Sequence, residues 1–180
     1  IVHAAGAGDK GLLSQLDARR VRWMYAAKAW GAWHVQSASA ASALEACVLF
    51  SSVGSGLGNV GQASYAAANA CLDAHALRRR SAGAAACGVQ WPLVGGAGMG
   101  AAAYAAASER RVSMVGLGGI SLEEYAACLG GQLAACVGAR LSVQLAHRRE
   151  VGEVVRDLAD ASQARFGELR GARAAAAGAA

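Results

Sequence analysis

The sequence predicts an α/β fold in which parallel strands are flanked by helices. Short apolar runs that contain β-branched residues alternate along the chain with longer segments whose apolar residues recur at helical spacing. Residues 46–80 show this unit most clearly, because an apolar run breaks into serine and glycine and then continues as an alanine-rich helix that ends in three arginines. The length of 180 residues suits one domain with a substantial core.

The first part of the chain predicts a strand followed by a long helix. Residues 1–8 have the composition of the carboxyl end of a buried strand that runs into a turn of small residues. Such a turn either lets a ligand approach the backbone closely or is a tight turn and nothing more. Residues 12–39 have helical spacing, with eight side chains available for an inward-facing stripe: Leu16, Val21, Met24, Tyr25, Lys28, Ala29, Trp30 and Trp33.

Three later apolar runs predict the remaining strands: residues 46–51, 86–91 and 141–146. We expect the first of these strands to be buried on both faces, as in a parallel sheet. A glycine-rich loop at residues 52–61 and a helix at residues 62–80 follow it. Ligands of such sheets bind outside the carboxyl ends of the strands, so Gly6, Ser52 and the turn after Trp91 should open onto one crevice.

Composition and charge exclude several classes of function. The net charge of +5 is spread over short, dispersed groups of arginines, which we interpret as solvated helix faces and not as a nucleic-acid surface. No uncharged apolar run reaches the roughly 18 residues that a membrane span needs, so we expect no membrane partner. The five cysteines are widely spaced without a CxxC pair, which predicts reduced thiols in a cytoplasmic protein.

Polar residues stand where a strand–loop–helix unit presents side chains to a ligand. Ser52 follows the strand, Tyr65 lies near the start of the helix, and Asn69 lies four residues further on, on the same helix face. Taken alone, Ser52 could be a helix cap and Tyr65 a half-buried helix residue. Lys28 stands among apolar and aromatic residues, where a lysine usually extends its amine to solvent.

Several sequence blocks occur together in one order and at one spacing. They read VHAAGAGDKGLL, then KAWGAWH, then VLFSSVGSGLGNVGQASYAAANACLDAHALRRR, and then VQW. In this order the blocks resemble the ketoreductase domains of modular polyketide synthases, within the short-chain dehydrogenase/reductase superfamily. The resemblance covers about residues 2–99 and continues more weakly to about residue 146.

The resemblance implies an active site of four residues: Ser52, Tyr65, Asn69 and Lys28. The wider superfamily has lysine four residues after the tyrosine, whereas polyketide ketoreductases exchange the lysine and asparagine positions. This chain has the polyketide arrangement, which favours a functional Lys28 over a solvent-directed one. The resemblance also implies that Ala5 and Gly6 contact the cofactor together with Lys28 and Tyr65, and it implies no metal ion.

The implied activity is the NADPH-dependent reduction of a β-ketoacyl thioester to the β-hydroxyacyl thioester. Hydride goes to carbon while negative charge grows on oxygen, so a proton must arrive and donors must hold the oxygen. Tyr65 would be the general acid, and Ser52 would donate a hydrogen bond to the carbonyl. Lys28 would stabilise the phenolate and bind the cofactor ribose, and Asn69 would hold Lys28 and a proton-relay water.

The resemblance also implies partners and domain limits. The substrate would be carried on the phosphopantetheine of an acyl carrier protein domain, beside other domains of a polyketide or fatty acid synthase. Residues 1–148 would form a partial ketoreductase catalytic region, and residues 149–180 a helical tail and low-complexity linker. The fold would be the carboxyl-terminal part of a Rossmann-like parallel sheet, with the amino-terminal cofactor-binding strands missing. We therefore expect the isolated chain to bind NADPH weakly or not at all and to be inactive.

Two other functions stay open at this point. A noncatalytic structural fragment of a synthase is favoured by the missing cofactor-binding half. A free-standing carbonyl reductase fits less well, because such enzymes usually carry lysine four residues after the tyrosine, where this chain has Asn69.

Overall fold

The computed structural model describes residues 1–58, 60–102, 104–105, 118–136, 143–145, 150–158, 160–168 and 170. These residues belong to two compact units, of which the first comprises Ile1–Trp91 and Leu122–Ala146, and the second Pro92–Ser121 and His147–Ala180. The first unit contains the sheet and all the candidate site residues. The predicted domain limit at residue 148 stays a prediction.

A parallel sheet of four strands forms the centre of the first unit, in the spatial order β1-β2-β3-β4. The strands are β1 (Val2–His3), β2 (Val48–Ser52), β3 (Cys87–Trp91) and β4 (Val143–Leu145). Val48 pairs with Val2 on one side and Cys87 on the other, and Ser52 pairs with Trp91. Because all the strands are parallel, their carboxyl ends meet at one edge of the sheet. The predicted α/β class is confirmed.

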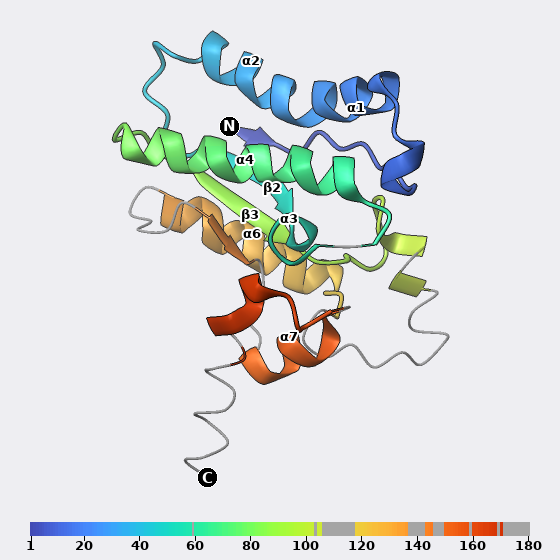
Figure 1. Cartoon of the computed structure of the whole chain (residues 1–180). Coiled ribbons are helices and arrows are strands. Elements are labelled where there is room, and N and C mark those ends of the chain that lie inside the picture. Colours follow the sequence, from blue (N-terminus) through green and yellow to red (C-terminus); the bar gives the residue numbers. More distant parts are fainter. Residues whose placement is uncertain are drawn as a thin grey trace. The chain divides into compact units, whose positions relative to one another are not determined.

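Helices cover both faces of this sheet (Figure 1). One layer contains α1 (Ala18–Tyr25), the π-helix η2 (Ala26–Trp30), α2 (Gly31–Ala38) and α4 (Ala63–Ser81). The other face carries α6 (Leu122–Cys136). The main core lies between α4 and the sheet and consists of small and medium apolar side chains: Ala32, Cys47, Leu49, Leu72, Ala76 and Ala86.

The predicted long helix at residues 12–39 differs from the structure in two respects. It begins only at Ala18, after the short 3₁₀ turn η1 (Leu13–Gln15), because Asp17 caps α1 by accepting a hydrogen bond from Arg20 N at 2.8 Å. Its middle is the π-helix η2, whose extra residue in the turn rotates the side chains that follow.

The buried side chains of these helices lie four residues apart, at Met24, Lys28 and Ala32. Met24 and Lys28 are buried, as the predicted stripe requires. Trp30 and Trp33 are 56% and 43% exposed, so their predicted inward orientation was wrong.

Aromatic rings pack between the sheet and α6. Trp91 lies 4.6 Å from Tyr125 and 5.3 Å from Phe50 between ring centroids, in tilted arrangements. Such pairs contribute stability beyond the area they bury. They attach the carboxyl ends of β2 and β3 to the start of α6.

The predicted glycine-rich loop at residues 52–61 begins as a helix, α3 (Val53–Leu57), which is a correction. Local bonds close this turn, because Ser52 Oγ accepts a hydrogen bond from Gly54 N at 3.2 Å. Gly58, with φ of 81°, ends it.

The second unit contains α7 (Val151–Asp157), the 3₁₀ turn η3 (Ala164–Phe166) and a parallel bridge between Val94 and Ile120. Residues 171–180 of the predicted helical tail and linker at 149–180, and the ends of the predicted strand 141–146, lie outside the described residues. Within the described part of the chain, no helix has both the length and the apolar character that crossing a bilayer requires.

Candidate active site

Ser52 occupies the point where β2 ends and α3 begins. Its backbone is extended, and its Oγ accepts a hydrogen bond from Gly54 N. No acceptor for the Ser52 hydroxyl proton is found among the described residues. The hydroxyl group can therefore donate to a ligand at the carboxyl edge of the sheet.

Tyr65 lies in the first turn of α4 and is half-buried. Its ring packs against a small core cluster formed by Ala7, Met24 and Ala68. Because Ala7 belongs to the turn after β1, this packing joins that turn to the start of α4. Within the part of the chain that the structure describes, the Tyr65 hydroxyl has no hydrogen-bond partner, so it too is available to a ligand.

Lys28 lies in the π-helix η2 and points inward, with only 3% of its surface exposed. Its Nζ donates a hydrogen bond to Phe50 O at 3.1 Å and lies 5.5 Å from the centroid of the Tyr65 ring. Burial lowers the pKa of Lys28 from 10.5 to about 8, and the charge of Asp73 opposes this shift. Lys28 therefore places an ammonium group beside the tyrosine, inside the protein, and does not extend to solvent.

Asn69 is fully buried one turn after Tyr65 on α4. Its Nδ2 donates to Tyr65 O at 2.9 Å, whereas its Oδ1 is buried with no hydrogen-bond partner among the described residues. The ammonium of Lys28 bonds to Phe50 O and not to Asn69. The expected hold of Asn69 on Lys28 stays a prediction, and the Oδ1 atom is the group that could make it.

Ala5 and Gly6 lie two and three residues after the end of β1 and are exposed. Since β1 and β2 are parallel neighbours, this exposed backbone and Ser52 lie at the same edge of the sheet. His3 is buried just before them, and burial, followed by the charge of Lys28, lowers the pKa of its imidazole. A Cβ at Gly31 would lie 3.0 Å from His3 Nε2, a tight contact that the missing side chain of this glycine avoids.

A hydrogen-bonded group behind Ser52 was missed at the level of sequence. Asp73 Oδ2 accepts from Ser55 Oγ at 2.6 Å and from Gln90 Nε2 at 2.9 Å. Ser55 Oγ also lies 2.8 Å from Ser52 O, so its single proton is shared between Asp73 Oδ2 and Ser52 O. The same hydroxyl oxygen accepts a hydrogen bond from Gln90 Nε2 at 3.0 Å. The backbone of Ser52 is therefore tied through Ser55 to a carboxylate on α4.

Two sequence signals could have found this group. Asp73 lies eight residues after Tyr65 and four after Asn69, so it shares their helix face, where a carboxylate needs partners. Gln90 is the polar residue of the otherwise apolar strand β3.

A second missed cluster fixes the turn after β1. Asp9 accepts hydrogen bonds from Arg20 at 2.5 Å and from Ser64 Oγ at 3.1 Å. The bond from Arg20 is the main cause that lowers the pKa of Asp9. Asp9 thus links this turn to the start of α1 and to the residue before Tyr65. No group of three potential metal ligands occurs in the described ranges.

The profile of the KR domain matches residues 1–96, which is more than half of the chain. The chain is a member of the KR family. The match contains all six predicted site residues and also Asp73 and Gln90. The predicted recognition is therefore confirmed, and the similar proteins are modular polyketide synthases and their ketoreductases.

Similar polyketide synthases come from several bacteria. The KR chain is 45% identical over 135 residues to the spectinabilin polyketide synthase system protein NorB of Streptomyces orinoci, which covers 75% of this chain and 6% of NorB. It is 50% identical over 91 residues to the polyketide synthase GfsB of Streptomyces halstedii, which covers 51% of this chain and 2% of GfsB. The chain therefore spans a small part of each relative.

Solved ketoreductases have the same fold. PlmKR1, the first-module ketoreductase of phoslactomycin biosynthesis in Streptomyces sp. HK803, is 30% identical with a TM-score of 0.74, covering 93% of this chain and 38% of that one. The first ketoreductase of the tylosin synthase is 29% identical with a TM-score of 0.70, covering 93% and 37%. The angucycline C-6 ketoreductase LanV, solved with bound NADP, is 14% identical with a TM-score of 0.67, and the match covers 81% of this chain and 59% of LanV. At this identity the match shows the shared fold alone.

Proposed function

We propose that this KR chain is the catalytic portion of an NADPH-dependent reductase that converts a β-ketoacyl thioester to a β-hydroxyacyl thioester. The observation that carries this proposal is the buried ammonium of Lys28, 5.5 Å from the ring of Tyr65, at the sheet edge where Ser52 ends β2. A half-buried tyrosine with a free hydroxyl, a serine donor and an interior cation are the groups that protonating a ketone oxygen requires.

Tyr65 donates the proton that the ketone oxygen gains as its carbon is reduced. Lys28 favours the phenolate left behind, because a nearby positive charge stabilises a negative one in a site with little water. With a pKa of about 8, Lys28 is largely protonated at neutral pH and can supply this charge.

Ser52 donates a hydrogen bond to the same oxygen. Its backbone is held through Ser55 by the carboxylate of Asp73, which fixes the position of the donor. A donor that is fixed before the reaction stabilises the developing charge without a cost of reorganisation.

The residues at this edge fit the nicotinamide end of NADPH, which supplies the hydride. The exposed backbone at Ala5 and Gly6 leaves room for a ring to approach. The buried Oδ1 of Asn69 has no partner among the described residues and, with Lys28, can bind a hydroxyl group or a water. The solved ketoreductase LanV, which shares the fold, contains NADP.

The acyl substrate would be presented by an acyl carrier protein domain, on its phosphopantetheine arm. The relatives NorB and GfsB are named as polyketide synthase proteins, and this supports other synthase domains as neighbours.

The test is a reduction assay on the full-length ketoreductase domain that contains this chain, with NADPH and a β-ketoacyl thioester. Tyr65→Phe should lower kcat at least about a hundredfold, the range that general acid catalysis contributes. The matched control is Tyr25→Phe, because this tyrosine packs against the same core cluster but is not one of the proposed site residues. Equal turnover by Tyr65→Phe and the parent would exclude the mechanism, and no turnover by a folded parent would favour a noncatalytic structural role.

A further inference from the structure

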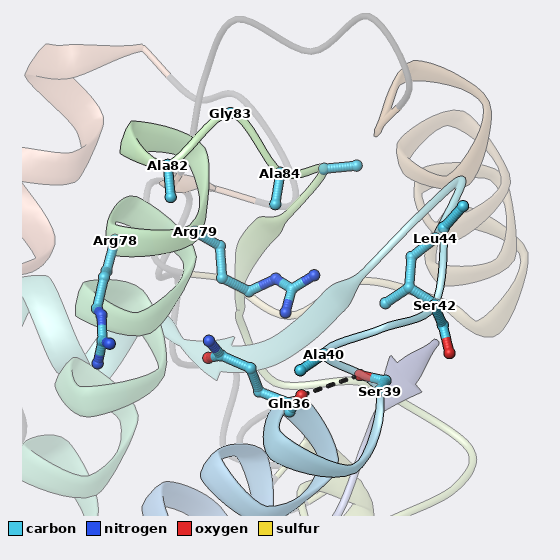
Figure 2. A pocket seen from close by; sticks show the side chains of 12 residues that line it. Gln36, Ser39, Ala40, Ser42, Leu44, Arg78, Arg79, Ala82, Gly83 and Ala84 are labelled. Atoms are coloured by element: carbon cyan, nitrogen blue, oxygen red, sulfur yellow. Dashed lines mark hydrogen bonds between the residues drawn. The ribbon is translucent and has the colours of Figure 1, made fainter.

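A cavity lies at the amino ends of β2 and β3, whereas Ser52 ends β2 at its carboxyl end. Figure 2 shows the side chains that line this cavity. Its volume is about 450 Å³. The walls come from the carboxyl ends of α2 and α4 and from the two connections that lead into the amino ends of β2 and β3, and they include Gln36, Ser39, Ser42, Leu44, Arg78 and Arg79. Since β2 has five residues, the cavity and Ser52 are separated by about 13 Å of strand.

Arg79 is the main charged group of this cavity. Its side chain is 9% exposed, and Figure 2 shows its guanidinium extending from α4 into the space between Gln36 and Leu44. Its Nε is buried without a hydrogen-bond partner, and no carboxylate of the described residues lies within 4.0 Å of it. A buried donor without a partner destabilises the folded protein, so a bound anion that accepts a hydrogen bond from Nε would stabilise it.

The other charged side chain among the described lining residues is also an arginine. Arg78 lines the same cavity, and its guanidinium lies 5.4 Å from the ring centroid of Trp33. Burial lowers the pKa of His75, and the positive charges of Arg79 and Arg78 lower it further. Among the described residues that line the cavity, none is acidic.

Gln36 requires a ligand that donates a hydrogen bond. Its Oε1 is buried and has no hydrogen-bond partner among the described residues. In Figure 2 its side chain extends toward the same space as Arg79. A ligand that satisfies both side chains needs an anionic oxygen that accepts from the Arg79 guanidinium and a hydroxyl group that donates to Gln36 Oε1.

We propose that this cavity is a binding site for a phosphate group that carries a proton, either free phosphate or a phosphate monoester. Arg79 binds the anionic oxygens of the phosphate, and Arg78 adds positive charge at the edge of the cavity. Gln36 accepts a hydrogen bond from the hydroxyl group of the phosphate. The volume falls within the range of small-ligand sites and leaves room for a group attached to the phosphate. The site is independent of the proposed reductase activity.

Isothermal titration of the protein with inorganic phosphate at pH 7 and low ionic strength tests this proposal. We expect saturable binding at one site, at least about tenfold weaker for Arg79→Gln, because a charge-assisted hydrogen bond is lost. The matched control is Arg80→Gln, which makes the same charge change one residue further along α4, does not line the cavity, and should bind within about twofold of the parent. Parallel titrations with glycerol phosphate distinguish a monoester from free phosphate.

Sulfate is the comparison for Gln36, because it carries no proton at neutral pH. We expect sulfate to bind more weakly than phosphate to the parent, and we expect Gln36→Leu to weaken phosphate more than sulfate. If Arg79→Gln does not fold, Arg79→Lys carries the test, since it keeps the charge but loses the forked geometry and should bind more weakly than the parent. Binding that does not saturate, or that Arg79→Gln and Arg79→Lys leave unchanged, would overturn the proposal.

Discussion

The substitution Lys28→Met removes a buried ammonium group and keeps most of the length of the side chain. Burial lowers the pKa of this lysine from 10.5 to about 8 in the folded protein, and Asp73 partly opposes the shift. In the unfolded chain the amine has its ordinary pKa. Between pH 8 and 10.5 the unfolded state therefore binds a proton that the folded state does not, so the contribution of Lys28 to the free energy of unfolding rises with pH.

The size of this effect follows from the two pKa values. The difference between 10.5 and about 8 is about 2.5, which at 1.36 kcal/mol per unit corresponds to about 3 kcal/mol. Below pH 8 the buried charge lowers stability by this whole amount, and the cost disappears as the pH approaches 10.5. Lys28→Met carries no such cost at any pH, so its stability relative to the parent should fall by most of this amount between pH 7 and 10.

Urea unfolding at pH 7, 8, 9 and 10 measures this difference. Comparing the variant with the parent at each pH cancels the titration of tyrosines and cysteines, which both proteins share. Lys10→Met is the matched control, because Lys10 is exposed and its loss should not change the pH dependence. A difference between Lys28→Met and the parent that stays constant from pH 7 to 10 would refute the burial of a charged Lys28.

Two further substitutions test the groups that hold the site. Asp73→Asn should lower kcat about tenfold with little change in KM, because it weakens the hydrogen bonds that hold the backbone of Ser52 through Ser55. It should also move the alkaline loss of activity to lower pH, because the charge of Asp73 raises the pKa of Lys28. Profiles of kcat against pH for the full-length domain measure both effects, with the exposed Glu45→Gln as control, and an unchanged profile would contradict the prediction. Asp9→Asn should destabilise the protein at pH 7, and this loss should shrink as the pH falls and the carboxylate of the parent is protonated, because the pKa of Asp9 is lowered in the folded protein. Urea unfolding over a pH series from 7 downward measures it, and a loss that stays constant over the series would contradict it.

The regular elements could be predicted because their patterns are local. The strand expected at residues 86–91 is Cys87–Trp91, and the helix expected at residues 62–80 is Ala63–Ser81. In both, burial against the sheet agrees with the apolar pattern of the segment. The four residues expected at the active site came from the family resemblance, and the structure brings Lys28 close to Tyr65.

The remaining features depend on contacts that local patterns do not contain. The π-helix Ala26–Trp30 has no sequence signal of its own, and Trp30 and Trp33 lie off the buried line of Met24, Lys28 and Ala32. The bonds of Asp73 with Ser55 and Gln90 join residues that are 17 or 18 positions apart, from α3, α4 and β3. Only the packing of α4 on the sheet brings them together.

The transfer of deuterium from NADPH that carries deuterium at both C4 positions of the nicotinamide to a β-ketoacyl thioester tests the proposed reaction most directly. The full-length domain that contains this chain is incubated with the labelled cofactor, and mass spectrometry follows the β-hydroxyacyl product. The account predicts one deuterium at the β-carbon of the product, formed by the parent and by Tyr25→Phe but not by Tyr65→Phe. Unlabelled product, or labelled product formed equally by Tyr65→Phe, would contradict it.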